Sequence, residues 1–408
     1  MPFLTADLAG TGGRIKVEPE DFRVDELSLF DPSGEGAHLL LRIEKRGMTT
    51  HEAAMRLARA LRIAEREVGF AGIKDSRAVA TQWFSVPAGC EARLGDLTHP
   101  WLTIRERARH SSKLRIGELE GNRFEIVVRD AAAGAADRAR AILDRLARRG
   151  VPNWFGEQRF GTKGDSDLLG RALVRGDCDE ALRYYLGRPS PREKDPRIRA
   201  ARQLFDEGRY DEAAQSFPPR LRTEASVLRA WRQHGDAFRA LFKVQKRLRL
   251  LFVSAYQARL FNRCLEARFD SLDRLLDGDV AVRHDTGRAF LVGDPGREQP
   301  LADSFAISAA GPIFGPGLPR ASGAAALLEE AVFAAEELDL EERGHLFPDL
   351  HLRGERRAYR FPLKGASVDP HATIADAIVV RFELPRGCYA TSVMAEVMKL
   401  APADDAIG

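Results

Sequence analysis

The chain alternates apolar and polar residues over several short stretches, which predicts β-strands near both ends of the sequence. Every second residue is apolar across 39–43 in "AHLLLRIEK", across 124–128 in "NRFEIVVRD" and across 378–382 in "DAIVVRFEL". Because the side chains of a strand point to opposite faces in turn, this spacing favours a sheet with one covered face. In the third stretch we expect Arg381 and Glu383 on the opposite, solvent-facing side.

A helical spacing replaces this alternation after the first stretch. In "TTHEAAMRLARALRI" the residues Ala54, Met55, Ala58 and Leu61 are expected on one buried helical face. Thr50 is expected to cap the N-terminus of this helix, because a threonine hydroxyl can accept a hydrogen bond from a free backbone N–H of the first turn.

Further helices are predicted from residue 137 onwards. A helix over 137–149 has a basic last turn followed by Gly150, which is typical of a helix C-terminus. Residues 165–269 contain few β-branched residues and many Arg, Ala and Leu, which indicates a series of helices. In the segment "YATSVMAEVMKL", the apolar residues of one helical stripe are Val393, Met394, Val397 and Met398.

The order of these elements, together with a length of 408 residues, predicts two domains. Domains cluster near about 100–150 residues, so a single core is not expected. From Val151 the sequence "VPNWFGEQRFGTKGDSD" is rich in turn formers, and strands return only after the helical block. We therefore expect an α/β (α+β) domain formed by residues 1–150 and 346–408, interrupted by an inserted, mostly helical domain over 151–345.

Composition is that of a globular protein, with 44% hydrophobic and 30% charged residues. No apolar run approaches the roughly 20 residues of a membrane span. The first residues, "MPFLTADLAGTGG", lack the basic start and apolar core of a signal peptide, so we expect a cytoplasmic protein. The four cysteines form no CxxC and the nine histidines form no HExxH or HxH, so we expect neither a disulfide nor a metal site.

The basic character of the chain is local, because the net charge is only +3. "RERARHSSKLR" over 105–115 holds five cations and one acid, and "KVQKRLR" over 243–249 holds four cations and no acid. Such runs can bind nucleic-acid phosphates, and they can equally lie on a solvated face, so both interpretations stay open.

No motif for a nucleotide cofactor is found. "GTGG" precedes a strand instead of following one, and neither GxxxxGK[ST] nor GxSxG occurs. What remains is a carboxylate and several aromatic residues at strand ends. In "AGIKDSRAVATQWFSV" an apolar approach ends at Lys74 and Asp75. A turn or cap aspartate is the ordinary interpretation of Asp75, and a catalytic carboxylate is the alternative.

Three other stretches carry polar and aromatic residues at similar places. "KVEPEDFRVDE" has Lys16 and Phe22 around a proline turn, and "GNRFEIVV" has Asn122 just before Phe124 at a strand start. "LPRGCYATS" has Tyr389 between a strand and a helix. Stacking rings and an amide that reads a base edge are what recognition of a flipped base requires. Taken singly, Phe22 and Phe124 fit an ordinary hydrophobic core better than a base-binding site.

Taken together, six stretches resemble the tRNA pseudouridine synthase D (TruD) family. They occur in the order of the family, from near residue 10 to near residue 398, and this resemblance, not composition or periodicity, carries the functional prediction. The stretches are "VEPEDFRVDE", "FAGIKDSRAVATQW", "GNRFEIVVRD", "VPNWFGEQRFG", "RLFNRCL" and "LPRGCYATSVMAE".

The resemblance implies a pseudouridine synthase fold, with a mixed, largely antiparallel sheet in circularly permuted strand order and an inserted domain that begins at "VPNWFGEQRFG". It also implies an isomerase that converts uridine to pseudouridine at position 13 of tRNA, in the D arm, without a cofactor. In the family motif G-x-K-D the aspartate is the nucleophile, which is Asp75 here. The residues expected to bind the substrate are Phe22, Asn122, Phe124, Tyr389, Lys16 and Lys74.

The chemistry explains why a carboxylate would stand at the end of a strand. A carboxylate nucleophile can attack C1′ of the ribose or C6 of the uracil, and the sequence leaves both open. It must be ionised, so a nearby cation is expected to offset the effect of burial on its pKa. Lys16 is the first candidate and Lys74 the second. The alternative for Lys74 is a phosphate contact, because neighbouring strand residues point to opposite faces.

Two other functions fit parts of the sequence. A non-catalytic RNA-binding protein or RNA chaperone on the same fold would be expected to lose Asp75, and a methyltransferase would need a cofactor loop that we do not find. We expect tRNA as the partner of a monomeric protein, with no protein partner and no membrane association. Whether RNAs other than tRNA are substrates stays open.

Overall fold

A computed structural model of the chain describes residues 2–337 and 352–399. The chain forms two compact units. Unit 1 consists of Met1–Val151 and Phe361–Gly408, and unit 2 consists of Pro152–Arg360. The predicted domain boundary at 345/346 lies outside the described residues, and the assignment of the units to a catalytic and an inserted domain stays a prediction.

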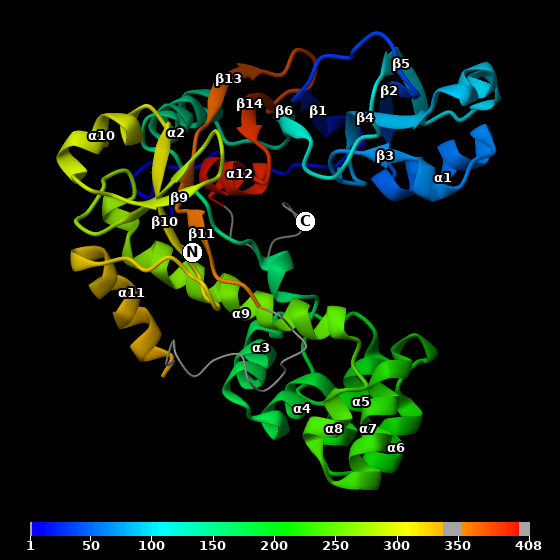
Figure 1. The fold of residues 1–408 in the computed structure, drawn as a ribbon, viewed down its shortest axis with the longest axis vertical. Helices are drawn as coiled ribbons and strands as arrows, with labels where there is room; N and C mark the ends of the chain where they lie inside the picture. Colours follow the sequence, from blue (N-terminus) through cyan, green and yellow to red (C-terminus); the bar gives the residue numbers. More distant parts are fainter. Residues whose placement is uncertain (1, 338–351, 400–408) are drawn as a thin grey trace. The chain divides into compact units, whose positions relative to one another are not determined.

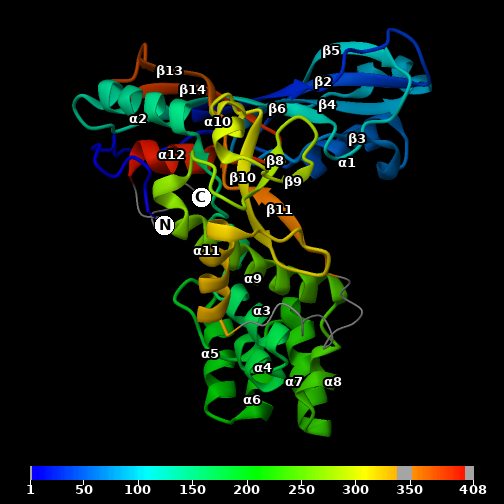
Figure 2. The ribbon, with the colours of Figure 1, turned by 60° about the vertical axis from the view of Figure 1, so that its left-hand side comes forward.

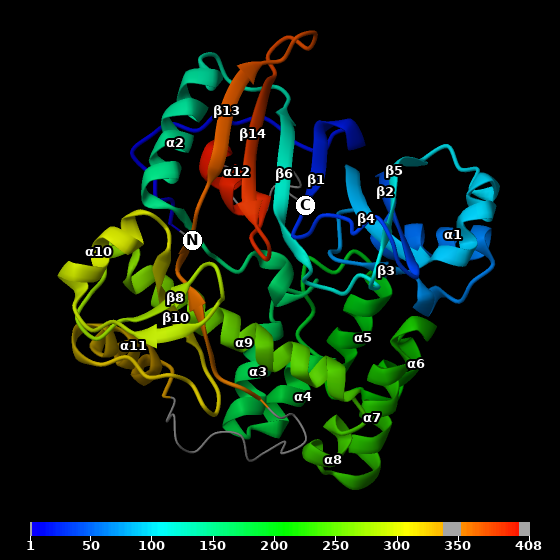
Figure 3. The same cartoon turned by 45° about the horizontal axis from the view of Figure 1, so that its top comes forward.

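Unit 1 is built around an eight-stranded sheet in which seven strands follow the order β13-β14-β6-β1-β4-β2-β5, and β3 pairs with β4 (Figure 3). The β1–β4 pair is parallel and all other pairs are antiparallel. The strands are β1 (Phe22–Ser28), β2 (His38–Arg46), β3 (Gly69–Phe70), β4 (Val79–Pro87), β5 (Leu102–His110), β6 (Leu119–Val128), β13 (Lys364–Pro370) and β14 (Ile378–Pro385). The helices are α1 (Thr50–Leu61), α2 (Ala135–Arg149) and α12 (Ala390–Met398), with short 3-10 turns η1 (Pro19–Asp21), η2 (Glu65–Glu67) and η3 (Ala88–Asp96).

Helix α1 covers the β2–β4 end of this sheet (Figure 1). Its buried residues Ala54, Ala58 and Leu61 pack with the alternating apolar residues of β2, as the sequence predicted. Met55 was placed wrongly, because its side chain is 46% exposed: it lies about 100° around the helix from Ala54. The N-cap was also wrong by one residue, since Thr49 accepts the hydrogen bond from Glu52 N.

Helices α2 and α12 lie at the β13–β14 end of the sheet (Figure 1). Helix α2 ends at Gly150, whose positive φ of 85° suits a residue without a side chain. The four apolar residues predicted as the stripe of the last helix are all buried. The helix predictions at both positions are therefore confirmed.

The other face of the sheet carries ion pairs on β6, β14 and β5. Arg381 pairs with Glu125 at 2.7 Å, and Arg105 pairs with Glu44 at 2.8 Å. Arg109 also pairs with Glu91. Two cations of the basic run over 105–115, both on the edge strand β5, are thus paired with acids of β2 and η3, which favours the solvated-face interpretation for that run.

Unit 2 combines a group of helices with a four-stranded antiparallel sheet of order β11-β10-β8-β9. Helix α9 runs from the helical group to the small sheet (Figure 2). The helices are α3 (Ser166–Arg175), α4 (Cys178–Leu186), α5 (Pro196–Asp206), α6 (Tyr210–Ser216), α7 (Arg222–His234), α8 (Ala237–Leu241), α9 (Lys246–Ala267), α10 (Pro295–Asp303) and α11 (Gly323–Ala335). The strands are β8 (Val280–Arg283), β9 (Ala289–Leu291), β10 (Ile307–Ile313) and β11 (Glu355–Ala358), and the 3-10 turns are η4 (Glu157–Phe160), η5 (Pro219–Leu221) and η6 (Phe269–Ser271). Two short strands, β7 (Val151–Pro152) and β12 (Arg360–Phe361), pair with each other.

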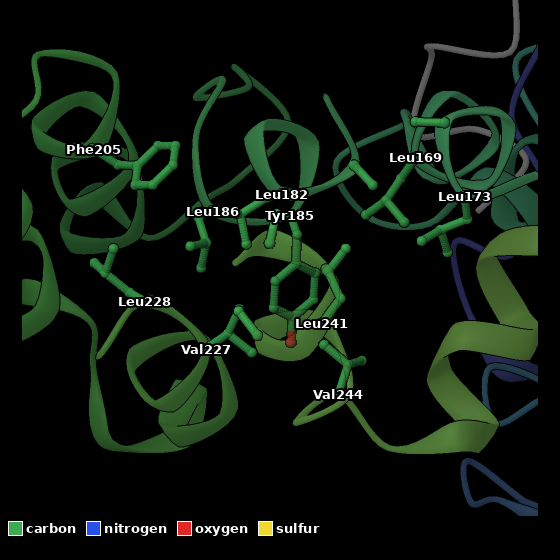
Figure 4. Close-up of a cluster of buried hydrophobic side chains, with 14 of the residues drawn as sticks. Leu169, Leu173, Leu182, Tyr185, Leu186, Phe205, Val227, Leu228, Leu241 and Val244 are labelled. Carbon is green, nitrogen blue, oxygen red and sulfur yellow. The ribbon is translucent and has the colours of Figure 1, made fainter. Parts of the chain in front are cut away.

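The helices α3 to α9 share one hydrophobic cluster, which we call the helical cluster (Figure 4). Leu182, Leu186 and Leu228 belong to it and are each at most 2% exposed. Gly170 allows α3 to approach α9 closely, because a Cβ atom at this position would overlap with the carbonyl group of Phe252. All helices in residues 2–337 and 352–399 are too short or too polar to span a lipid bilayer.

Candidate active site

Asp75 lies in unit 1, in the segment that joins β3 to β4. Burial alternates along this segment: Lys74 is 7% exposed, whereas the Asp75 side chain is 36% exposed. Asp75 Oδ1 accepts a hydrogen bond from Arg77 N at 2.9 Å, as in a turn-forming aspartate. The second carboxylate oxygen is left for a different partner.

That partner is Lys16, whose Nζ donates to Asp75 Oδ2 at 2.5 Å. The Lys16 side chain is only 6% exposed, so water screens this pair weakly. Burial raises the pKa of Asp75, but the hydrogen bonds from Lys16 and Arg77 N outweigh burial and hold the pKa below its usual value. Asp75 is therefore ionised at neutral pH, as a carboxylate nucleophile must be.

The loop that carries Lys16 is anchored by hydrogen bonds on both sides of this residue. Its backbone has a left-handed φ of 57°, which is uncommon for a residue with a side chain. Arg14 and Arg129 exchange two backbone hydrogen bonds of 2.8 Å just before it. After it, the buried Asp21 accepts from Arg129 at 2.8 Å and from Glu18 N at 2.9 Å. These contacts hold both ends of the loop in place.

Lys74 does not oppose Asp75, which corrects its expected role as a second cation. Its Nζ lies 2.7 Å from Glu26 Oε2 and donates to Asn122 Oδ1 at 2.6 Å. The Lys74 and Glu26 side chains are 4% and 2% exposed, so the ammonium group is not open to a phosphate either. The physical reason is that neighbouring side chains of this segment point to opposite sides, so the Lys74 side chain is buried while the Asp75 side chain is exposed.

Buried polar side chains, which we call the polar layer, form hydrogen bonds to the backbone of the segment that carries Asp75. Lys74 N donates to Thr50 Oγ1 at 2.8 Å, and Thr50 Oγ1 in turn donates to Gln82 Oε1 at 2.9 Å. Gln82 Nε2 donates to Gly72 O at 3.0 Å. Because these groups are buried and satisfied, the backbone leading to Asp75 is held in one conformation.

Lys45 completes this layer directly beneath Asp75. It is fully buried on β2, and its Nζ donates to Asp75 O at 2.9 Å and to Met48 O at 2.6 Å. Burial lowers the pKa of Lys45 to about 8, although the Asp75 carboxylate opposes that shift. Lys45 thus holds the nucleophile candidate by its backbone, while Lys16 holds the carboxylate.

The predicted aromatic residues fall into two groups. Phe22 and Phe124 are 4% and 6% exposed and meet edge to face with ring centroids 6.0 Å apart. Lys16 Nζ lies 4.7 Å from the centroid of the Phe22 ring, so Lys16 joins this pair to Asp75. Tyr389 is 52% exposed at the start of α12, and its ring is open to a partner.

A family model described as tRNA pseudouridine synthase D (TruD) matches residues 1–397. The chain belongs to the TruD family. A relative named tRNA pseudouridine synthase D from Geobacter sulfurreducens is 45% identical over 398 residues, 97% of this chain and 96% of the relative. One of the same name from Anaeromyxobacter sp. (strain Fw109-5) is 40% identical and covers 98% of this chain and 96% of its own length.

The fold agrees with a solved structure of the family. A crystal structure titled as the putative TruD from Methanosarcina mazei has a TM-score of 0.88 and 27% identity, and covers 98% of this chain and 97% of that chain. Membership in the TruD family, together with this likeness, confirms the predicted family, the predicted mixed α/β fold and the predicted isomerase class. The circular permutation of the strand order stays a prediction.

Sequence reasoning missed several residues that this TruD family member places around Asp75. They are Lys45, Glu26, Gln82 and Thr50, the last of which was expected only as a helix cap. A signal for Lys45 was present, since it continues the inward positions of Leu39, Leu41 and Ile43 along β2. A charged residue at an inward position needs buried partners, and this marks it as a site candidate. Among the residues the structure describes, no three His, Cys, Asp or Glu side chains are grouped so that they could hold a metal ion.

Proposed function

We propose that this chain isomerises uridine to pseudouridine at position 13 of tRNA, in the D arm, with Asp75 as the nucleophile on a flipped base. The observation that supports it most directly is the ion pair of Asp75 with Lys16 at 2.5 Å, in a chain that matches the TruD family over residues 1–397. The pair keeps the carboxylate charged in a place that a base can shield from water.

In this proposal the chemistry needs no co-reactant, because uridine and pseudouridine contain the same atoms. Asp75 attacks either C1′ of the ribose or C6 of the uracil. The N1–C1′ bond breaks, the base turns while it is held in the site, and a bond forms between C5 and C1′. The bond from Asp75 to C1′ or C6 breaks again, either as C5 attacks C1′ or by elimination from C6, and this regenerates the carboxylate. The proton on C5 is then lost and N1 gains one. The ionised Asp75 would begin this sequence, and Lys16 would keep it ionised.

The other predicted residues would hold the base. The exposed ring of Tyr389 offers a stacking surface, while Phe22 and Phe124 form an apolar wall beside Lys16. Asn122 would read an edge of the uracil. Its Oδ1 accepts from Lys74, so its Nδ2 group is the one that would donate to a uracil carbonyl oxygen. Lys74 would thus act by orienting Asn122, with Glu26 compensating its charge.

We also propose that unit 1 is the catalytic domain, predicted over 1–150 and 346–408, and that unit 2 is the inserted domain, predicted over 151–345. The cations of the run over 243–249 that could reach tRNA are Lys243, Lys246 and Arg247, which are exposed. Arg249 belongs to a different environment, because it is buried with its guanidinium 4.6 Å from the Phe242 ring centroid.

The test is to incubate the purified protein with an unmodified tRNA transcript and to map pseudouridine at each position. We expect conversion at position 13 by the wild-type protein and none by the Asp75→Asn variant. Conversion only at another position would contradict position 13 as the target nucleotide. Binding of tRNA without any conversion would favour a non-catalytic RNA-binding protein. Light scattering of the same sample tests the predicted monomer, and fractionation of cells tests the predicted cytoplasmic location.

A further inference from the structure

Two isoleucines, one on the segment that carries Asp75 and one on a turn hydrogen-bonded to that segment, expose a large part of their apolar surface. Ile73 and Ile116 are each 67% exposed. Ile73 lies two positions before Asp75, and the buried Lys74 separates them. Ile73 and Asp75 are exposed on either side of the buried Lys74, so we infer that the Ile73 side chain lies on the side of the segment from which Asp75 is reached.

Ile116 belongs to a neighbouring turn that is tied to the same segment. Gly117 N donates to Ala71 O at 2.8 Å, and Glu118 Oε2 accepts from Arg115 N at 2.8 Å to close the turn. Arg386 Nη1 donates to Gly117 O at 2.8 Å. The segment that carries Ile73, the turn that carries Ile116 and the loop before Tyr389 are therefore held together by hydrogen bonds.

The charges around these isoleucines allow an RNA strand to approach. Arg77, Arg115 and Arg386 are exposed on the same three segments. Apart from Asp75, which pairs with Lys16, the acids there are Glu118, which accepts from the backbone of its own turn, and the exposed Glu120. Arginine groups beside apolar surface are typical of sites that contact both the backbone and the faces of unpaired nucleotides.

We propose that Ile73 and Ile116 form an apolar ledge that packs against the base of a nucleotide adjacent to the target uridine. The inference rests on the proposed function and adds a contact outside the pocket for the reacting base. When a nucleotide is flipped towards Asp75, the backbone carries its neighbours to the rim of the site. Their bases lose a stacking partner at that step, and the ledge covers the face that is exposed.

The test uses the variants Ile73→Ser, Ile116→Ser and the double variant. Both side chains are largely exposed, so the thermal unfolding temperature should change little. We expect the double variant to bind tRNA about tenfold more weakly, because the apolar area of two side chains is no longer covered. The slope of affinity against salt concentration should stay the same, since no phosphate contact is removed. Met55→Ser, a substitution of an exposed apolar residue on α1, is the matched control and should bind normally.

A double-mutant cycle identifies the contact. tRNAs with an abasic nucleotide on the 5′ or the 3′ side of the target uridine are bound to the wild-type protein and to the double variant. If the ledge packs against that base, one of the two abasic tRNAs should cost the wild-type protein about tenfold in affinity and cost the double variant little. Equal losses for both proteins at both positions would overturn the proposal.

The outcome is separable from that of the proposed function. If the wild-type protein forms no pseudouridine in intact tRNA, the proposed function fails, whatever the cycle shows. If it forms pseudouridine and the double variant keeps wild-type affinity for tRNA, the ledge is excluded and the function stands. A changed salt slope in the double variant would also exclude the ledge, because it would show that the loss is electrostatic.

Discussion

The surroundings of Asp75 in unit 1 and the helical cluster in unit 2 use burial in opposite ways. In the helical cluster the buried side chains are aliphatic and aromatic, and they fill space between helices. Beneath Asp75 the buried side chains include Lys45, Lys74, Glu26 and Gln82. Apolar burial stabilises a fold in proportion to area, whereas burying a charged pair gains little or nothing over an apolar core of the same volume.

This difference indicates which property the surroundings of Asp75 control and which property the helical cluster controls. The polar layer orders the segment that carries Asp75, so its residues set geometry more than they set stability. The residues of the helical cluster are apolar and act by packing, so they set stability. Substitutions should therefore separate into those that slow the reaction of a folded protein and those that unfold a protein whose chemistry is intact.

The largest effect is expected at Asp75 itself. Asp75→Asn removes the charge and keeps the shape, so the rate of pseudouridine formation should fall by about 10⁴-fold or more, the order seen when a nucleophile is lost. Binding of tRNA should stay within a few-fold. Single-turnover assays and a filter-binding titration measure the two quantities. Asp137→Asn, on the exposed side of α2, is the control, and appreciable turnover by a verified Asp75→Asn protein would exclude Asp75 as the nucleophile.

Leu182→Ala should show the opposite behaviour. Leu182 is 2% exposed in the helical cluster, and its truncation should lower the free energy of unfolding by about 2–5 kcal/mol. Below the unfolding transition, the single-turnover rate at saturating tRNA should be unchanged. Urea denaturation followed by circular dichroism measures the loss. Leu251→Ala, at a residue that is 45% exposed on α9, should cost less than about 0.5 kcal/mol, and an equal loss for both would contradict the comparison.

Lys16→Met should change the pH dependence of the reaction. Burial would then raise the pKa of Asp75 with only Arg77 N and the charge of Lys45 left to oppose it, so the acid limb of the rate profile should move to higher pH. We expect a loss of about tenfold or more at pH 6 and a smaller loss at pH 8, because each unit of pKa changes the ionised fraction by up to tenfold. The measurement is the single-turnover rate across that range.

The sign of the stability effect follows from the same pKa. In the folded wild-type protein the pKa of Asp75 lies below its usual value, so its pairing stabilises the fold above that usual value and is lost as the pH falls through the lowered one. The control is Arg14→Met, which removes an exposed cation of the same loop that pairs with Asp130. A Lys16→Met profile that overlays the wild-type profile would show that Lys16 does not control the ionisation of Asp75.

Removing the exposed ring of Tyr389 and the buried ring of Phe22 should have different effects on stability. Tyr389→Ala and Phe22→Ala should each slow single-turnover chemistry by the equivalent of about 1–3 kcal/mol, and weaken tRNA binding less. Only Phe22→Ala should also lower the unfolding temperature, because Phe22 is buried and Tyr389 is half exposed. Tyr389→Phe keeps the ring and should retain the wild-type rate. Full rates in both alanine variants would make these rings structural.

The smallest effect is expected on the surface of unit 2. The Lys243/Lys246/Arg247→Ala triple variant should weaken binding to all tRNAs and flatten the log–log salt dependence by about one unit per lost phosphate contact. Chemistry at saturating tRNA should change little, because phosphate contacts position a substrate without reading its sequence. Arg209→Ala, which removes a cation already paired with Glu212, is the control. An unchanged salt slope in the triple variant would place the run on a solvated face.

Local patterns were sufficient for much of the fold. The alternation in 378–382 predicted the buried and exposed sides of β14, and the basic turn before Gly150 predicted the end of α2. These predictions of the fold succeed because they depend on residues close in sequence, so no knowledge of distant contacts is needed. The motifs of the TruD family singled out Asp75 and Lys16, which form an ion pair in the structure, and their roles in catalysis stay a prediction.

The partners of the charged residues could not be predicted in this way. Lys74 is adjacent to Asp75 in sequence, yet its ammonium group meets Glu26 on β1 and Asn122 on β6. Lys45 reaches the carbonyl group of Asp75 across 30 positions of the chain. Such contacts depend on the pairing of β1 with β4 and β6, which brings separate segments to one face of the sheet. Burial then decides the outcome, because a charge removed from water must find its counterpart among whichever side chains the sheet has placed beside it.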